Sequence, residues 1–136
     1  MYKTVSIIGG DLRLVNLINL LAKDDFLVYT YGLENAEELV ERENVKKCAS
    51  IAELVGSSEI IIGPVPMTND SVNLSAPFSE EKISIEELIT EMSNKNKMFL
   101  AGKLSDKTIQ SLQEGNINYI DLLKREELVV LNTIAT

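Results

Sequence analysis

The sequence has no histidine, no tryptophan and a single cysteine, Cys48. Without an imidazole, this chain alone cannot perform histidine-based acid–base catalysis or activate a nucleophile through histidine. The lack of histidine also argues against a zinc site, and one cysteine excludes a disulfide within the chain. We therefore expect no metal in this chain and a reducing compartment, the cytoplasm.

Basic residues and long apolar runs are also few. The 13 Lys and Arg residues are outnumbered by 21 Asp and Glu, which gives a formal net charge of −8. This charge repels phosphate backbones and anionic membranes, so nucleic acid is not an expected partner. The longest uncharged apolar stretch, residues 60–67, is broken by one glycine and two prolines and is far shorter than the ~20 residues of a membrane span. Asp11 and Arg13 interrupt the region where a secretory signal would be apolar.

The first informative stretch joins a strand to a helix through two glycines. Residues 3–9 are rich in valine and isoleucine, as expected for a strand buried on both faces. Gly9 and Gly10 end this strand, and apolar residues then recur every three or four positions from residue 11 to 23, which predicts an amphipathic helix. Backbone N–H groups, an acid and a guanidinium thus meet at one helix N-terminus.

The same alternation continues along the 136 residues, 45% of which are hydrophobic, enough for one domain. Further strands are predicted over residues 26–31, 59–63, 98–102 and 117–121, and helices over 35–43, 50–55, 84–92 and 106–114. Residues 45–49 are predicted as a short extended piece and residues 67–82 as a long loop. We therefore predict a three-layer α/β fold, flavodoxin-like or Rossmann-like, with five parallel strands in the order 2-1-3-4-5.

In open parallel sheets, ligands bind beyond the carboxyl ends of the strands. Seven residues near those ends are the candidate substrate-binding residues: Gly9, Gly10, Asp11, Arg13, Pro66, Thr68 and Lys103. Arg13 is suited to bind a carboxylate with two parallel hydrogen bonds, and Lys103 is placed to attract an anion. No general acid or base can be assigned among them.

Each candidate has a structural alternative. Gly9 and Gly10 either let a carboxylate approach the backbone or only form a tight turn. Arg13 either binds a carboxylate or pairs with Asp11, which is better explained as a helix cap than as a base. The prolines around residue 65 most simply fix the direction of the chain, Thr68 lies where it can bind a polar ligand, and Lys103 is equally explained as a solvated lysine.

For four other residues a structural role is the better explanation. Glu34 has the position of a ribose-binding acid, but an exposed loop carboxylate explains it better. Phe78 either closes over a planar ring or, more simply, anchors its loop. Asp121 is predicted to cap a following helix, and Cys48 to be a partly buried small side chain.

Cofactor sites are not expected in this chain. A dinucleotide fingerprint starting at Gly9 would require glycines where Asp11 and Leu14 stand. A flavodoxin-type flavin site is disfavoured, because no Ser/Thr-rich loop follows the first strand. A phosphoacceptor signalling domain would need an acid after the third strand, where Gly63 and Pro64 stand instead.

Four segments resemble one known family. These are IGGDxR at residues 8–13, GPVP at 63–66, APFS at 76–79 and DLLxREEL through LN at 121–132. In this order and spacing they resemble the amino-terminal domain of the A subunit of dipicolinate synthase. The resemblance implies an NAD(P)-dependent oxidoreductase of sporulating bacteria that forms dipicolinate, pyridine-2,6-dicarboxylate, from a dihydrodipicolinate-type intermediate. The implied compartment is the cytoplasm of the mother cell.

The resemblance also implies two domains with different roles. Residues 1–123 would form a substrate-binding-type domain, similar to the substrate domain of 2-hydroxyacid dehydrogenases. Residues 124–136, with Leu128, Val129, Leu131 and Asn132 at helical spacing, would form a helix leading to a carboxy-terminal nucleotide-binding domain. NAD(P) would bind in that other domain, and the B subunit of dipicolinate synthase, which is flavoprotein-like, would be a partner. The 136-residue chain alone is expected to be inactive, and the choice between NAD and NADP stays open.

A non-enzymatic function is the alternative. The domain could be an assembly or ligand-binding module, because the apolar residues 129–134 suit docking on a partner or self-association as a homodimer.

Overall fold

A computed structural model describes residues 3–68, 70 and 72–122. Strands and helices alternate along the chain: β1 (Lys3–Ile8), α1 (Leu12–Lys23), β2 (Phe26–Tyr31), β3 (Val45–Lys47), α2 (Ile51–Gly56), β4 (Ile60–Ile62), α3 (Ile85–Met92), β5 (Met98–Ala101), α4 (Asp106–Glu114) and β6 (Asn118–Asp121). Serine or aspartate caps the N-terminus of every one of these helices: Asp11, Ser50, Ser84 and Ser105 each accept a backbone N–H from the first turn. The part of the chain described here contains no helix long and apolar enough to span a membrane.

The strands form one parallel sheet of six strands in the order β3-β2-β1-β4-β5-β6. The predicted five strands in the order 2-1-3-4-5 are therefore wrong, because β3 adds a sixth strand beside β2. The three residues of β3 pair with β2: Val45 lies opposite Val28, Lys46 opposite Tyr29 and Lys47 opposite Thr30. A strand this short has no readable alternation of its own, and its neighbour β2 supplies the pairing that forms it.

The predicted helix over residues 35–43 is also absent. These residues form turns and irregular chain. The side chain of Asn19 on α1 accepts the N–H of Val40 at 3.1 Å and donates to the carbonyl of Glu38 at 3.0 Å. Because Asn19 pairs with these backbone groups, the segment lies along α1 and forms isolated turns, such as the bond from the Leu39 N–H to the Ala36 carbonyl at 3.2 Å, in place of a helix.

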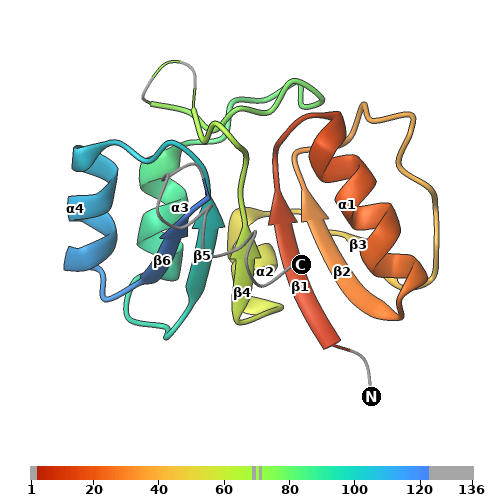
Figure 1. Cartoon of the computed structure of the whole chain (residues 1–136), viewed down its shortest axis with the longest axis horizontal. Coiled ribbons are helices and arrows are strands. Elements are labelled where there is room, and N and C mark those ends of the chain that lie inside the picture. The colour runs from red at the N-terminus through yellow and green to blue at the C-terminus, as the bar shows by residue number, and fades with distance from the viewer. Residues whose placement is uncertain (1–2, 69, 71, 123–136) are drawn as a thin grey trace, which may run out of the picture.

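The two faces of the sheet are covered differently (Figure 1). On one face, which we call the α1 face, Val5, Ile7 and Val28 pack against Val15 and Ile18 of α1. On the opposite face, residues of α2, α3 and α4 pack in one cluster around Ile8, Ile61 and Phe99 of the sheet. The three-layer α/β prediction thus corresponds to one helix on the first face and three on the second among the described residues.

The predicted loop after β4 crosses the carboxyl edge of the sheet, the edge at the top of Figure 1. Its described residues make only isolated bridges, between Thr68 and Leu74 and between Asn73 and Ser84. Met67, Leu74 and Ile83 are buried and anchor it to the core. The predicted helix over residues 124–136 lies outside the described residues.

Candidate functional site

The turn between β1 and α1 requires glycine. Gly9 and Gly10 have φ angles of +64° and +94°, in the left-handed region that other residues rarely adopt. A Cβ on Gly10 would lie 2.2 Å from Cδ1 of Leu14, so the first turn of α1 packs directly on this glycine. The expectation of a tight turn is confirmed, and it holds independently of any ligand.

The backbone donors of this turn are already paired. The N–H of Gly9 donates to the carbonyl of Tyr31 at 2.8 Å, and the N–H of Gly10 donates to the carbonyl of Ser75 at 2.8 Å. A carboxylate would have to displace these carbonyls to bind here. Direct contact between these glycines and a ligand therefore stays a prediction, and the structure assigns both N–H groups to the β2 strand end and the loop after β4.

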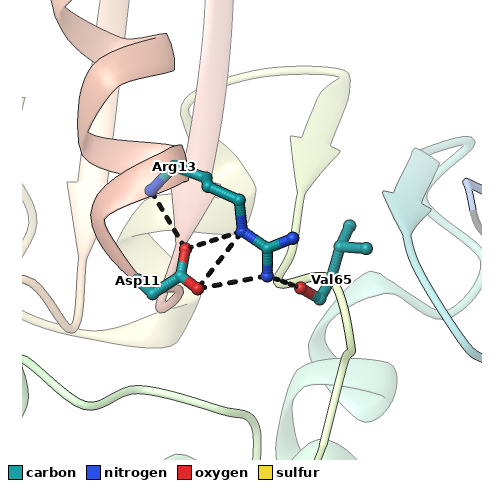
Figure 2. A network of polar contacts seen from close by, with 3 residues as sticks. All are labelled: Asp11, Arg13 and Val65. Carbon is teal, nitrogen blue, oxygen red and sulfur yellow. Dashed lines mark hydrogen bonds and ion pairs between the residues drawn. The ribbon is translucent and has the colours of Figure 1, made fainter.

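Asp11 and Arg13 form an exposed ion pair at the N-terminus of α1 (Figure 2). Asp11 caps the helix by accepting the Arg13 N–H at 3.0 Å, and it also accepts the Arg13 side-chain Nε at 3.2 Å and Nη2 at 3.1 Å. The hydrogen bonds from the Arg13 side chain are the main cause that lowers the pKa of the Asp11 carboxyl, and they raise the pKa of the guanidinium in return. Both groups are thus held in their charged forms.

Arg13 also joins two corners of the sheet edge. Its Nη2 donates to the carbonyl of Val65, in the segment that leaves β4 (Figure 2). The turn after β1 and the exit from β4, far apart in sequence, are therefore in direct contact. The Arg13 side chain remains 67% exposed, and its Nη1 has no hydrogen-bond partner among the described residues. Two N–H groups of the guanidinium are left to face a ligand.

The exit from β4 is fixed by backbone hydrogen bonds to Gly102, the residue that follows β5. Gly102 donates to the carbonyl of Pro64 at 3.1 Å, and Met67 donates to the carbonyl of Gly102 at 2.7 Å. The Val65–Pro66 peptide bond between them is cis. Pro66 thus lies in a rigid segment beside Arg13, as the sequence predicts for its structural role.

Thr68 is engaged within its own loop. Its hydroxyl donates to the carbonyl of Asn73 and is 3.2 Å from a carboxylate oxygen of Asp70. Asp70 accepts the N–H groups of Asn73 and Val72, which hold its pKa well below the usual range. These contacts shape the loop, so a ligand contact of Thr68 stays a prediction.

Lys103 stands at the same edge, at the end of β5. Its backbone adopts a φ of +58°, and its N–H donates to the carboxylate of Asp121 at 2.9 Å. The other oxygen of Asp121 accepts the N–H of Leu104 at 2.9 Å. Asp121 is only 8% exposed, whereas Lys103 is exposed. The buried carboxylate therefore holds the turn that presents the lysine to solvent.

The sequence did not reveal this use of Asp121. Its predicted role as a cap of the following helix concerns residues outside the described part. The signal present in the sequence was an acid ending one strand beside a neighbouring strand that ends in Gly102, because paired strands bring such ends together.

The candidates therefore form one tight group and one neighbour. Gly9, Gly10, Asp11, Arg13 and the Val65–Pro66 segment are in contact. Lys103 ends β5, and β4 lies between β5 and β1 in the sheet. Two strand spacings of about 4.8 Å separate β1 from β5, so a ligand of roughly 10 Å or a flexible lysine bridges the gap.

A dinucleotide does not fit the turn after β1. Pyrophosphate binding at such a turn uses free backbone N–H groups and a third glycine against the helix. Here the N–H groups of Gly9 and Gly10 are paired, and Leu14 fills the place of the third glycine. Within the described part of the chain, no group of three His, Cys, Asp or Glu residues is placed to hold a metal ion.

Two hollows lie away from the turn after β1. One of about 320 Å³ lies at the ends of β2 and β3 and is lined by Tyr31, Glu34, Cys48 and Glu81 among others. Burial and the nearby glutamates raise the pKa of the Tyr31 hydroxyl, and burial followed by the charge of Glu53 raises the pKa of the Cys48 thiol. Such surroundings disfavour anions. A groove of about 640 Å³ lies between α3 and α4 and contains none of the candidates.

Comparison with solved structures shows the same fold in longer proteins. The structure of dipicolinate synthase, A chain, from Bacillus subtilis matches with a TM-score of 0.76 and 20% identity over 98% of this chain and 44% of that one. The A subunit of dipicolinate synthase from Bacillus halodurans gives 0.73 and 22%, over 97% of this chain and 44% of that one. This chain thus spans less than half the length of either protein.

A more distant match is the NADPH-dependent glyoxylate/hydroxypyruvate reductase from Sinorhizobium meliloti. Its TM-score is 0.54 at 16% identity, over 93% of this chain and 40% of the reductase. Parallel-sheet domains of dehydrogenases therefore share this fold. No curated protein matches the sequence.

A family profile covers nearly the whole described domain. The profile that describes the N-terminal domain of the dipicolinate synthase A subunit matches residues 4–123. This range includes every candidate residue. It also includes Val65, whose carbonyl accepts the hydrogen bond from Arg13. The resemblance noted in the sequence is thereby confirmed, and the chain belongs to the family of N-terminal domains of dipicolinate synthase A subunits.

Proposed function

We propose that this chain is the substrate-binding part of a dipicolinate synthase, an NAD(P)-dependent oxidoreductase that converts a dihydrodipicolinate-type intermediate into pyridine-2,6-dicarboxylate. The observation that carries the proposal is the contact of Arg13 with the Val65 carbonyl. It fixes a guanidinium at the carboxyl edge of the sheet, where open α/β folds bind ligands, and leaves Nη1 unpaired among the described residues.

Arg13 and Lys103 are the groups assigned to the substrate carboxylates. Asp11 holds one side of the guanidinium, so the orientation of the free Nη1 is set before a ligand arrives. Asp121 fixes the backbone of Lys103, while its long side chain adapts to the second carboxylate. Fixed cations of this kind orient a substrate and reduce the entropy lost on reaching the transition state.

The redox step belongs to residues other than these. Aromatisation of a dihydropyridine ring requires an acceptor for a hydride, and the first turn of this chain does not fit a dinucleotide. We assign NAD(P) to a carboxy-terminal nucleotide-binding domain, which is consistent with the 44% of the relatives' length that this chain spans. Residues 124–136 would lead to that domain, and the 136-residue chain alone would be catalytically inactive.

The biological setting follows from the family. The enzyme would act in the cytoplasm of the mother cell of a sporulating bacterium and would associate with the B subunit of the synthase. A homodimer is compatible with this arrangement. The acidic chain, with a net charge of −8, gives no reason to expect nucleic acid or an anionic membrane among its partners.

Titration with pyridine-2,6-dicarboxylate tests the proposal. We expect amide NMR shifts at residues 9–13, 65 and 103, and at least about tenfold weaker binding by Arg13→Met, as befits a lost charge-assisted pair. Lys23→Met is the matched control, because it removes one positive charge from the other end of the same helix. The titration uses metal-free buffer, since the ligand chelates divalent cations.

A second ligand separates specific binding from general anion attraction. Pyridine-2-carboxylate has one carboxylate, so it should bind more weakly than the dicarboxylate and lose its dependence on either Arg13 or Lys103. If the dicarboxylate causes no shifts at residues 9–13, or if Lys23→Met weakens binding as much as Arg13→Met, the substrate site is refuted. A non-enzymatic assembly module would then be the better description.

A further inference from the structure

Half of the α1 face is apolar and has no helix over it in the described structure. In a parallel sheet, directly paired residues point to the same face, so the register identifies the side chains involved. Ile62 pairs with Ile7 and Leu100, while Ile60 pairs with Met98. On the last strand Ile120 pairs with Leu100. Since Ile7 packs against α1, all of these residues point to the α1 face.

We call Ile60, Ile62, Met98, Leu100 and Ile120 the open face. Ile60 is 41% exposed, and the other members are half-buried. The helices α2, α3 and α4 contribute their buried residues to the cluster on the opposite side. Figure 1 shows α1 beside β1 and β2, away from β5 and β6. Among these five residues, only Ile62 packs against the cluster that α1 covers.

Leaving this face in water is unfavourable. Strands of parallel sheets are normally buried on both faces, and apolar surface contributes about 25 cal/mol per Å² when it is removed from water. Ile60 and Met98 are adjacent on neighbouring strands, as are Ile62, Leu100 and Ile120. The residues therefore form a continuous apolar surface, which requires a cover.

We propose that the open face is the docking surface of the chain's own last residues, 123–136. The segment starts directly after Leu122, whose N–H donates to the carbonyl of Ala101 at the end of β5. It therefore leaves the sheet at the strands that carry the open face. No connecting loop from another part of the chain is needed to bring it there.

The direction of the crossovers favours the α1 face as the docking surface. The connection from β1 to β2 moves toward the β3 edge with its helix on the α1 face, and the connections from β3 onward move the other way with helices on the opposite face. Both follow the right-handed rule. A segment that turned back from β6 toward β1 would move in the same direction as the first connection, which has its helix on the α1 face.

Length and composition also fit. The last 14 residues would span about 20 Å as a helix, at about 1.5 Å per residue, whereas β4 to β6 cover roughly 10 Å. At helical spacing Leu128, Leu131 and Ala135 fall on one side, with Ile134 next to them. Thr133 falls on the opposite side, and Asn132 and Thr136 lie between the two sides. The apolar side matches the open face, and the polar side would face outward.

Engineered disulfides test the proposal in the full chain, with Cys48→Ser to remove the natural thiol. We expect Ile60→Cys combined with Leu131→Cys to form a disulfide within one molecule on mild oxidation. Leu20→Cys with Leu131→Cys is the control, because Leu20 is 64% exposed on the outer side of α1. A disulfide formed only between molecules would identify a second copy as the occupant and overturn the proposal, as would equal reaction of the control pair.

Oxidation of Met98 gives a second readout that needs no cysteine. The pair Leu128→Asp and Leu131→Asp should detach the segment and speed peroxide oxidation of Met98 about fivefold, measured by peptide mass spectrometry. Thr133→Asp adds a charge on the predicted outward side and should leave the rate unchanged. The buried Met92 serves as the internal reference for global unfolding. Equal rates in all three chains would refute docking on the open face.

Discussion

Two turns at the carboxyl edge of the sheet are each fixed by an aspartate, but the two aspartates differ in surroundings. Asp11 lies at the start of α1, 45% exposed at its side chain, and pairs with an arginine that is itself exposed. Asp121 ends β6, is 8% exposed and accepts two backbone N–H groups of the β5–α4 turn. One carboxylate thus orients a charged side chain, and the other maintains the backbone.

The difference separates binding from stability at this site. Exposed ion pairs contribute little to the free energy of unfolding, because water and salt screen them. A buried carboxylate with backbone partners contributes more, because its loss leaves buried donors unpaired. Loss of the Asp11–Arg13 ion pair should therefore affect ligand binding more than folding, and loss of the Asp121 carboxylate should affect folding.

The largest effect is expected for Asp121→Ala. The change leaves the N–H groups of Lys103 and Leu104 without their carboxylate acceptor, at a cost of about 3 kcal/mol in unfolding free energy. Urea denaturation followed by circular dichroism measures it. Lys103→Met, which keeps the backbone N–H, is the control and should stay close to the unchanged chain. A loss below about 0.5 kcal/mol for Asp121→Ala would remove the contrast between the two turns.

Gly10→Ala should rank second. Its φ of +94° is strained for any residue with a Cβ, and that Cβ would meet Leu14 within 2.2 Å. We expect a loss of about 2 kcal/mol. Gly56→Ala is the matched control, because a Cβ there meets nothing within 4 Å. If Gly10→Ala is as stable as the control, the first turn is more adaptable than its geometry indicates.

Asp11→Ala should cost about 1 kcal/mol, the usual loss for a helix N-cap. Asp11→Asn keeps an acceptor for the Arg13 N–H while removing the charge, so it should recover most of that stability. Chemical denaturation of the two variants distinguishes capping from the ion pair. Equal losses for both would mean that the charge matters more than the cap.

The smallest effect concerns pH. Folding lowers the pKa of the Asp11 carboxyl. The stabilisation from the Asp11–Arg13 ion pair is therefore complete at pH values above the ordinary carboxyl pKa. It is lost as the pH falls through the lowered pKa that Asp11 has in the folded chain. Arg13→Met should raise the pKa of Asp11 toward its ordinary value, as followed by NMR of the side-chain carboxyl. Lys23→Met should leave this titration unchanged. An unchanged Asp11 pKa in Arg13→Met would show that the N-cap alone sets it.

Much of the fold was predictable because it depends on local patterns. The valine and isoleucine runs of β1 and β4 and the spacing of α1 and α3 are visible in the sequence and lie where predicted. The segment over residues 35–43 has the composition of a helix, but Asn19 of α1 provides hydrogen bonds to its backbone. Contacts of this range cannot be read from a window of neighbouring residues.

The position of the site could be predicted from the sequence, but most of the hydrogen bonds between its residues could not. The rule for open parallel sheets located Arg13 and Lys103 at one edge. The pairing of Arg13 with Asp11 was one of two stated alternatives, and the structure contains it. The contact with Val65 and the use of the glycine N–H groups depend on how the loop after β4 folds back, which nothing in the sequence of that loop specifies.

The edge strand β3 has a consequence for assembly. An unpaired edge exposes backbone donors and acceptors to which a strand of another molecule can add, and such addition can propagate into aggregates. Here the outermost strand has three residues, and two of them, Lys46 and Lys47, are exposed. A second molecule approaching edge to edge would bring like charges together over a very short length of backbone, so this sheet is protected from growing at that end.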